Sequence, residues 1–268
     1  MTNSLALAAL KQRMKSTWMA GDFGQIARIN ERSSEEFVER LRLRPGMRVL
    51  DVACGTGNQS IPAARNGVRV TGLDMRRTCS NRPGNALAPK IWRLIIEGDT
   101  EDLPYNAAEF DVVLSMFAMF APRPERVTAE LLRVCRPGGL IAMGNWTPQG
   151  FIGKTFALMS RHVAHPPRVV PPVLWGDEAV VAERFRSKAK IRTIRRSAPF
   201  EVPLGPEQTV ELFKTYFGPT KTAFEQLDAA GQQALHRDLV ALWTAHNRAT
   251  DGRTSVHLEF LEVYAWPN

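Results

Sequence analysis

The sequence lacks the features that mark several classes of protein. It has only three cysteines, and Cys54, Cys79 and Cys135 show neither the paired spacing of a zinc site nor that of a disulfide framework. No stretch approaches the roughly 20 apolar residues that a transmembrane helix needs. The basic residues near the N-terminus are not followed by an apolar segment and a cleavage site, so no signal peptide is indicated. These absences predict a reduced, cytoplasmic protein with no membrane span and no metal site.

The sequence has little acidic charge relative to basic charge. Its 35 basic and 27 acidic residues give a net charge of +8. Such a balance could indicate nucleic acid or an acidic partner. The basic residues are scattered, however, and no basic run is interleaved with aromatic residues, so a solvated surface is the simpler interpretation. The 268 residues, 44% of them hydrophobic, fit one large domain or one domain with a substantial insertion, without internal repeats or low-complexity segments.

Residues 48–75 have the pattern of a nucleotide-binding α/β unit. A short apolar run over 49–52 predicts a strand, Gly55 and Gly57 predict a turn, residues 58–65 a helix, and residues 68–73 a second strand. Glycine lets the backbone turn sharply and lets a ligand approach. Asp74 ends the second strand, where a carboxylate can accept hydrogen bonds from the two hydroxyls of a ribose. The unit therefore predicts a bound nucleotide or nucleoside.

The charge of that ligand follows from two neighbouring residues. A dinucleotide fingerprint has a third glycine at position 60, and this chain has Ser60. Asp51, near the end of the first strand, would repel a pyrophosphate and attract a cationic amino group. A structural turn in another kind of α/β protein is the alternative interpretation.

The same residues resemble a family signature. Asp51, Ala53, Gly55 and Gly57 are similar to the acid-x-Gly-x-Gly-x-Gly motif of class I S-adenosylmethionine-dependent methyltransferases, with Ala53 in place of the first glycine. The ammonium and sulfonium of S-adenosylmethionine agree with the position of Asp51. The resemblance implies an α/β, Rossmann-like fold, in which helices cover both faces of a seven-stranded, mostly parallel sheet with an antiparallel last strand. It also implies a set of cofactor-binding residues, which are Trp18, Asp51, Ala53, Gly55, Gly57, Asp74, Met75, Asp99, Thr100 and Ser115.

Motifs further along the chain extend the resemblance. Asp99 is similar to the acid that accepts from the adenine amino group, residues 102–104 and 110–113 are typical of small-molecule methyltransferases, and residues 136–139 resemble the turn into the fifth strand. The segment 76–92 departs from the family, because Pro83, Gly84 and Pro89 oppose the expected helix. It is either an irregular loop or the product of two compensating reading-frame shifts. Beyond residue 145 the chain resembles a subgroup related to quinone-biosynthesis methylases.

The pattern predicts one methyltransferase domain with three parts. Residues 1–45 form an N-terminal helical cap, 46–147 the cofactor-binding core, and 148–268 an acceptor-side half with a helical insertion around 205–250. Helices are expected over 5–18, 26–43, 124–133, 153–161, 206–217 and 222–246, and over residues 178–185 with Asp177 as the cap. The strands expected after residue 75 span 92–97, 110–115, 140–144, 190–195 and 255–266.

Three functions are consistent with this sequence. The leading one is transfer of a methyl group from S-adenosylmethionine to a small, apolar or aromatic molecule by in-line displacement, in a monomer or homodimer. Catalysis would then consist of alignment and exclusion of water. A nucleic-acid methyltransferase is the second, suggested by the positive charge, although residues 115–118 are not the Asn/Asp-Pro-Pro-Tyr of that class. A non-catalytic cofactor-binding protein is the third, suggested by the irregular segment after Asp74.

Side chains that could serve the acceptor are less clearly marked. His162 and His165 are candidate general bases, and a base is often unnecessary when the acceptor is an amine or a thiol. An apolar lining is expected from aromatic and methionine residues in the middle of the chain, namely Phe117, Met119, Phe120, Phe151, Phe156, Met159 and Trp175.

Overall fold

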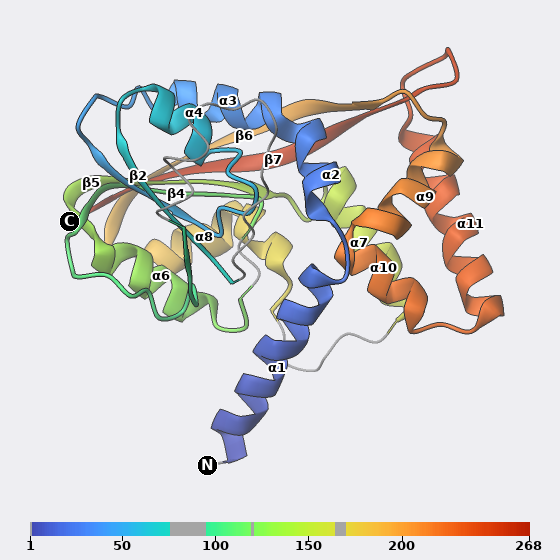
Figure 1. The fold of residues 1–268 in the computed structure, drawn as a ribbon, viewed down its shortest axis with the longest axis horizontal. Coiled ribbons are helices and arrows are strands. Elements are labelled where there is room, and N and C mark those ends of the chain that lie inside the picture. Colours follow the sequence, from blue (N-terminus) through green and yellow to red (C-terminus); the bar gives the residue numbers. More distant parts are fainter. Residues whose placement is uncertain (1, 76–94, 119–120, 164–169) are drawn as a thin grey trace. The chain divides into compact units, whose positions relative to one another are not determined.

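The computed structural model describes residues 2–75, 95–118, 121–163 and 170–268. These residues form two compact units (Figure 1). The first unit comprises residues 1–30, 146–169 and 197–259, and the second comprises 31–145, 170–196 and 260–268. Within the described ranges, no helix is long and apolar enough to cross a membrane.

A seven-stranded sheet carries the Rossmann-like fold. Its strands lie in the order β3-β2-β1-β4-β5-β7-β6. Their bounds are β1 Arg48–Val52, β2 Arg69–Asp74, β3 Ile95–Glu97, β4 Phe110–Met116, β5 Cys135–Trp146, β6 Ala189–Val202 and β7 Thr254–Pro267. The first five strands, β1 to β5, are parallel to one another. The last strand, β7, is antiparallel to β6, because Ser255 contacts Glu201 at one end and Asn268 contacts Lys188 at the other. The predicted fold class is confirmed.

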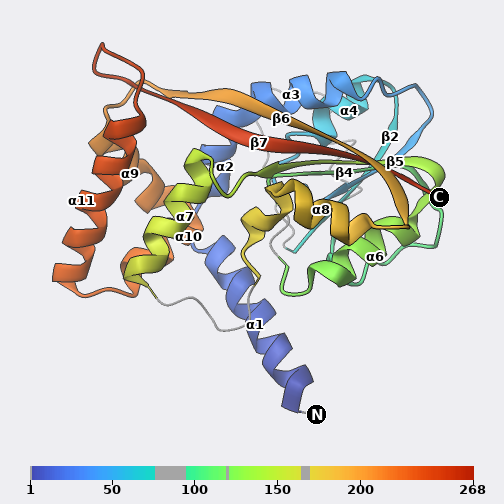
Figure 2. The ribbon, with the colours of Figure 1, turned by 180° about the vertical axis from the view of Figure 1, so that it is seen from behind.

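Helices cover both faces of the sheet in the second unit. Helices α3 (Glu31–Arg40) and α4 (Ser60–Arg65) lie over one face, and α6 (Pro124–Val134) and α8 (Glu178–Phe185) lie over the other (Figure 1 and, from behind, Figure 2). The core between the sheet and α6 and α8 includes Leu50, Val113 and Leu131, all fully buried. Parallel strands covered on both faces need apolar residues on both, which is why β1 and β4 read as short continuous apolar runs.

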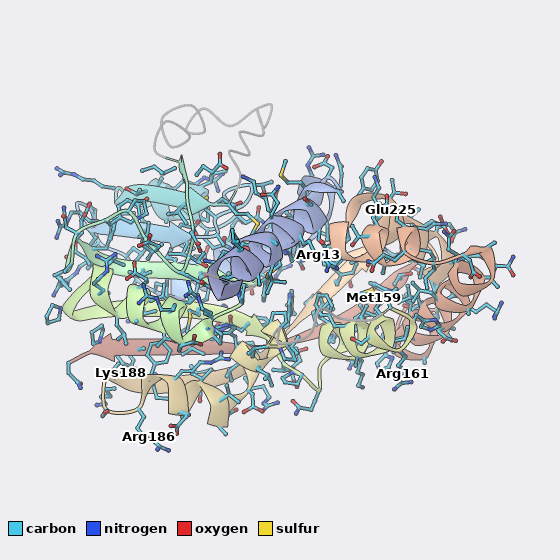
Figure 3. The ribbon with its side chains drawn as sticks, turned by 90° about the horizontal axis from the view of Figure 1, so that it is seen from below. Arg13, Met159, Arg161, Arg186, Lys188 and Glu225 are labelled. Carbon is cyan, nitrogen blue, oxygen red and sulfur yellow. The ribbon has the colours of Figure 1, made fainter. Side chains whose placement is uncertain are left out.

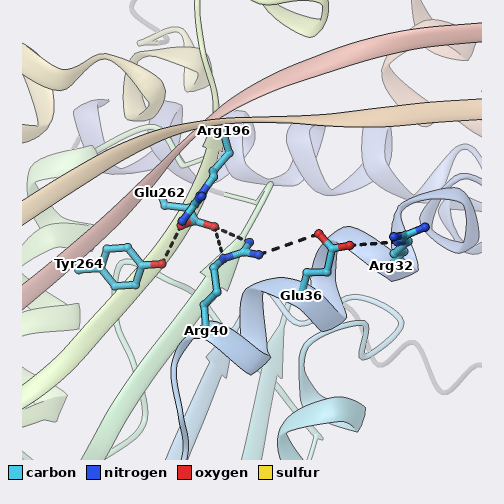
Figure 4. A network of polar contacts seen from close by, with 6 residues as sticks. All are labelled: Arg32, Glu36, Arg40, Arg196, Glu262 and Tyr264. Atoms are coloured by element: carbon cyan, nitrogen blue, oxygen red, sulfur yellow. Dashed lines mark hydrogen bonds and ion pairs between the residues drawn. The ribbon is translucent and has the colours of Figure 1, made fainter.

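A buried carboxylate ties three elements of this unit together. Glu262 of β7 is fully buried, and it accepts hydrogen bonds from Arg40 Nε at 3.0 Å, Arg196 Nε at 3.1 Å and Tyr264 Oη at 2.7 Å (Figure 4). Arg40 lies on α3 and Arg196 on β6, so the network fixes α3 against the last two strands. The exposed Glu36 forms an ion pair with Arg40 and so extends the network toward solvent.

The first unit is largely helical. It contains α1 (Thr2–Met19), α2 (Phe23–Ala27), η1 (Arg28–Asn30), α7 (Phe151–His162), α9 (Pro206–Tyr216), α10 (Gly218–Glu225) and α11 (Ala229–His246). Two glycines let the chain around the end of α1 approach the start of α10. A Cβ on Gly21 would collide with the carbonyl oxygen of Tyr216, and a Cβ on Gly218 would collide with that of Thr17. Glycine is therefore required at both positions.

Two predicted helices are wrong in their extent. The helix expected over 26–43 is interrupted, because the chain tightens into the 3₁₀ turn η1 before α3 begins. The helix expected over 222–246 is divided into α10 and α11, since Asp228 caps α11 by accepting from the backbone N–H of Gly231 at 2.8 Å. The cap predicted at Asp177 is confirmed, because its Oδ1 accepts from Ala179 and Val180.

The predicted turn over 136–139 occurs as a bulge inside β5. Cys135 pairs with Phe110 and Leu140 pairs with Val112, so the four residues 136–139 lie opposite the single residue Asp111 of β4. Arg136 Nε donates to Asp111 Oδ1 at 2.8 Å. The backbone N–H of Arg48 and then Arg136 lower the pKa of the Asp111 carboxyl.

Candidate functional site

The loop between β1 and α4 has a left-handed backbone at alternate residues. The φ angles are +56° at Ala53, +51° at Gly55 and +82° at Gly57. A Cβ built on Gly55 would meet no atom of the described residues within 4 Å, so there is open space beside the loop. Ala53 adopts the left-handed conformation at a cost of about 1 kcal/mol. The loop thus has the conformation that its glycines favour.

Asp51 is a buried carboxylate with an incomplete set of partners. It is fully buried, and the Ser60 hydroxyl donates to its Oδ2 at 2.6 Å. Within the part of the chain that the structure describes, no group donates to its Oδ1, although that atom is also buried. Burial raises the pKa of this carboxyl from 3.8 to about 7, the Ser60 hydrogen bond opposes that rise, and the charge of Asp74 adds to it. The site therefore holds a carboxylate that lacks a donor.

Asp74 ends β2 and holds the loop. Its Oδ2 accepts the backbone N–H of Gly55 at 2.9 Å, and its side chain is nearly buried. Since Asp51 pairs with Gly72 in the parallel register, the two carboxylates end neighbouring strands on the same edge of the sheet. Met75 follows Asp74 and is half-buried.

The ends of β3 and β4 complete this edge. The Asp99 Oδ1 accepts the backbone N–H of Glu101 at 2.9 Å, which orders the turn that contains the half-buried Thr100. Ser115 is buried on β4, and its hydroxyl donates to the carbonyl oxygen of Val52 at 2.9 Å. The carboxyl ends of β1, β2, β3 and β4 thus bring together nine of the ten predicted site residues, at the edge where α/β sheets bind ligands.

Known proteins resemble the chain over this core and well beyond it. The family model described as "Methyltransferase domain" matches residues 50–143. The "Uncharacterized protein Rv1403c" of Mycobacterium tuberculosis (strain ATCC 25618 / H37Rv) is 38% identical over 221 residues, covering 80% of each chain. The "Uncharacterized methyltransferase sll0829" of Synechocystis sp. is 29% identical over 133 residues, covering 47% of this chain and 61% of the other. The chain belongs to the class I S-adenosylmethionine-dependent methyltransferases.

A solved structure shares the fold of this methyltransferase. The putative methyltransferase from an antibiotic biosynthesis pathway of Anabaena variabilis ATCC 29413 superposes with a TM-score of 0.56 at 15% sequence identity, covering 93% of this chain and 99% of the other. The shared fold therefore covers most of the chain, beyond the residues that the family model matches.

The site of the methyltransferase fits its cofactor, S-adenosylmethionine. The buried Oδ1 of Asp51 lacks a donor, and the ammonium of the cofactor is a cationic donor. The open space beside Gly55 leaves room for a ligand against the backbone. Cys54, within the same loop, is not a reactive thiol, because burial and then the charges of Asp51 and Asp74 raise the pKa of its thiol well above 9.0.

Trp18, the tenth predicted residue, belongs to the first unit. Its ring packs edge to face against Phe23, with centroids 5.8 Å apart, and against Phe217, with centroids 5.6 Å apart. Its role at the cofactor stays a prediction. The candidate base His162 forms a 2.8 Å contact between its Nε2 and Oδ2 of Asp238.

Three of the five described residues of the expected acceptor lining are packed in cores. Trp175 is 2% exposed beneath the guanidinium of Arg184, and Phe151 is 3% exposed against Trp243. Met159 is likewise buried. His165, Met119, Phe120 and the predicted irregular segment 76–92 lie outside the described residues.

Ser60 is a residue at this site that the sequence pattern did not single out. In the sequence, this position stands out only because a dinucleotide fingerprint would have its third glycine there. In the structure it begins α4, directly beside the carboxylate of Asp51. A hydroxyl residue in the first turn of the helix after a strand-terminal acid is the signal that could have revealed it.

Proposed function

We propose that this methyltransferase transfers the methyl group of S-adenosylmethionine to a small, apolar or aromatic molecule by in-line displacement. The sulfonium of the cofactor supplies the activated methyl group. The chain holds the cofactor, orients the acceptor and excludes water. Residues 46–147 would serve the cofactor and residues 148–268 the acceptor, within one functional domain.

The unpaired oxygen of Asp51 carries the cofactor part of this proposal. Leaving a buried acceptor without a donor costs about 1–3 kcal/mol, so a ligand that donates to it recovers free energy. We assign Asp51 to the ammonium, Asp74 to the ribose hydroxyls and Asp99 to the adenine amino group. The left-handed backbone at Gly55 and Gly57 leaves room for the ligand. Met75, Thr100 and Ser115 would line the same edge.

Two groups of aromatic residues support an apolar acceptor. Phe117 follows β4 at this edge, is half-buried, and has a φ of +60°. Such strain in a residue with a bulky side chain is typical of functional sites. Its ring packs edge to face on Phe260, with centroids 5.3 Å apart. In the first unit, half-buried rings contact one another and offer apolar surface; they belong to Trp18, Phe23, Phe156 and Phe217.

Two measurements test this function. Calorimetry with S-adenosylmethionine should give binding that Gly55→Val abolishes, since a β-branched side chain fills the open space and opposes a positive φ. The Gly252→Val variant is the matched control, because Gly252 also has a positive φ and open space but lies in the first unit. Absence of binding at millimolar cofactor would overturn the proposal.

The acceptor is then identified with methyl-labelled cofactor and fractionated metabolite extracts. Label is expected in a small molecule that partitions into organic solvent. Label in the nucleic-acid fraction would instead favour the second function. Label in neither fraction, with intact cofactor binding, would favour a non-catalytic role.

A further inference from the structure

One end of the sheet exposes cations beside aromatic rings. Lys188 precedes β6, and Lys190 and Arg192 lie on it; all three are exposed. Figure 3 labels Lys188 and the neighbouring Arg186 in this part of the second unit. Tyr264 and Trp266 of β7 are half-buried, and their rings are stacked with centroids 6.5 Å apart and planes 21° apart. We call five residues together the β6–β7 face: Lys188, Lys190, Arg192, Tyr264 and Trp266.

The strand register places these residues on one side of the sheet. The backbone N–H of Asn268 donates to the carbonyl oxygen of Lys188 at 3.2 Å. Because the strands are antiparallel, Trp266 lies opposite Lys190 and Tyr264 lies opposite Arg192. Residues opposite each other point to the same face of a sheet. The intervening Ala189 and Ile191 pack into the core on the other face.

The charges of this face are not neutralised by the protein. Within the described residues, the side chains of Lys188, Lys190 and Arg192 form no hydrogen bond or ion pair. The carboxylate nearest the rings in the sequence is Glu262, which is buried and already bound by two arginines. The face therefore presents net positive charge to solvent.

This combination of groups matches one class of partner. Side chains two residues apart along a strand are separated by about 7 Å, so Lys190 and Arg192 are adjacent on this face, and Lys188 directly precedes the strand. A row of cations beside aromatic rings is the arrangement that binds the phosphates and bases of a single strand. Exposed lysines on an edge strand also prevent edge-to-edge association, but that role does not require the adjoining rings.

We propose that the β6–β7 face binds single-stranded nucleic acid, with its cations on the phosphates and its rings against the bases. The inference concerns a binding surface of the methyltransferase, not its methyl acceptor. It holds whichever small molecule is methylated.

The test uses fluorescence anisotropy with a labelled oligouridylate of about 12 nucleotides and the full chain. The first variant combines Lys188→Gln, Lys190→Gln and Arg192→Gln. Its control removes three exposed cations of the first unit that also have no partner among the described residues, Arg161→Gln, Arg237→Gln and Arg248→Gln. The first variant should lose about tenfold or more in affinity, and the slope of log K against log salt should become shallower by about 2. The control should lose several-fold less.

A third variant tests stacking. Trp266→Ala should weaken oligouridylate binding about tenfold while leaving the salt slope unchanged, and Trp266→Phe should retain most of the affinity. Cofactor affinity should be the same in every variant, which verifies that each is folded. Equal losses in the two charge variants would overturn the proposal. So would full affinity of Trp266→Ala, or binding of anionic lipid vesicles by this face without binding of the oligonucleotide.

Discussion

Asp51 and Glu262 are both fully buried carboxylates of the second unit, yet their surroundings are opposite. Glu262 accepts from two arginines and a tyrosine, all supplied by the chain. Asp51 receives one serine hydroxyl, and its other oxygen lacks a donor within the described residues. An ionised carboxylate is stable in a protein interior only with compensating partners. Glu262 therefore has its full set of partners within the chain, whereas one oxygen of Asp51 is left for a donor from outside the described residues.

The largest expected effect concerns the pH dependence of the ligand-free protein. The pKa of Asp51 is about 7 in the folded state against an ordinary value of 3.8, so folding favours its protonated form. Its contribution to stability is fully present below about pH 4 and is lost as pH rises through about 7. Asp51→Asn removes this loss. The variant should therefore exceed the wild type in unfolding free energy by an amount that grows up to roughly 4 kcal/mol by about pH 8.

Urea denaturation at a series of pH values measures that difference. The same variant should bind S-adenosylmethionine more weakly, because it lacks the charge that attracts the ammonium. A constant difference in stability between about pH 4 and pH 8 would contradict the assigned pKa.

Replacing Glu262, unlike replacing Asp51, should lower the unfolding free energy. Glu262→Ala leaves Arg40 and Arg196 without their shared anion, so the unfolding free energy should fall by about 3 kcal/mol. Cofactor affinity below the unfolding transition should not change. Glu36→Ala removes an exposed member of the same network and should cost less than about 1 kcal/mol. If Glu262→Ala and Glu36→Ala lowered the unfolding free energy equally, the buried carboxylate would not be the centre of the network.

Asp74→Ala tests the neighbour of Asp51. The variant should lose about 1–3 kcal/mol of cofactor binding, since the hydrogen bond that we propose to the ribose and the anchor for the Gly55 backbone both disappear. The pKa of Asp51 should also fall, because the charge of Asp74 helps to raise it. Calorimetry measures the loss of cofactor binding, and the pH dependence of that binding reports the pKa of Asp51. Asp111→Ala, which removes a carboxylate at the other end of β4, serves as the control.

The smallest effect is expected in the loop that joins these carboxylates. Ala53→Gly relieves a left-handed alanine and should raise the unfolding free energy by up to about 1 kcal/mol. Ala63→Gly, inside α4, should instead lower it by about 1 kcal/mol. Thermal unfolding of the two variants should therefore shift in opposite directions. Shifts of the same sign would show that the backbone at Ala53 is not strained.

Local spacing was sufficient to predict the loop and the acids around it. The strand, the glycine turn and Asp74 follow one another within 27 residues, and each depends on neighbours in the sequence. The contact of Ser60 with Asp51 was missed, because the position of the hydroxyl depends on how the first turn of α4 meets β1. Nor could the network of Glu262, since Arg40 lies 222 positions away.

The acceptor side was harder to predict for a different reason. Apolar residues such as Phe151 and Trp175 fit a ligand pocket and a protein core equally well in sequence. Only the packing of other elements decides between them, and it places both residues in cores. The division of 222–246 into two helices was missed at Asp228, a cap that resembles any other exposed acid until its hydrogen bond is seen.

The glycine contacts at Gly21 and Gly218 have a practical consequence for protein engineering. They fit α1 closely to the start of α10, so the first 19 residues are an integral part of the first unit. A shortened form of the protein that begins after Met19 would leave Phe23 and Phe217 without the ring of Trp18. Apolar surface exposed in this way promotes association. Truncation for crystallisation should therefore retain helix α1.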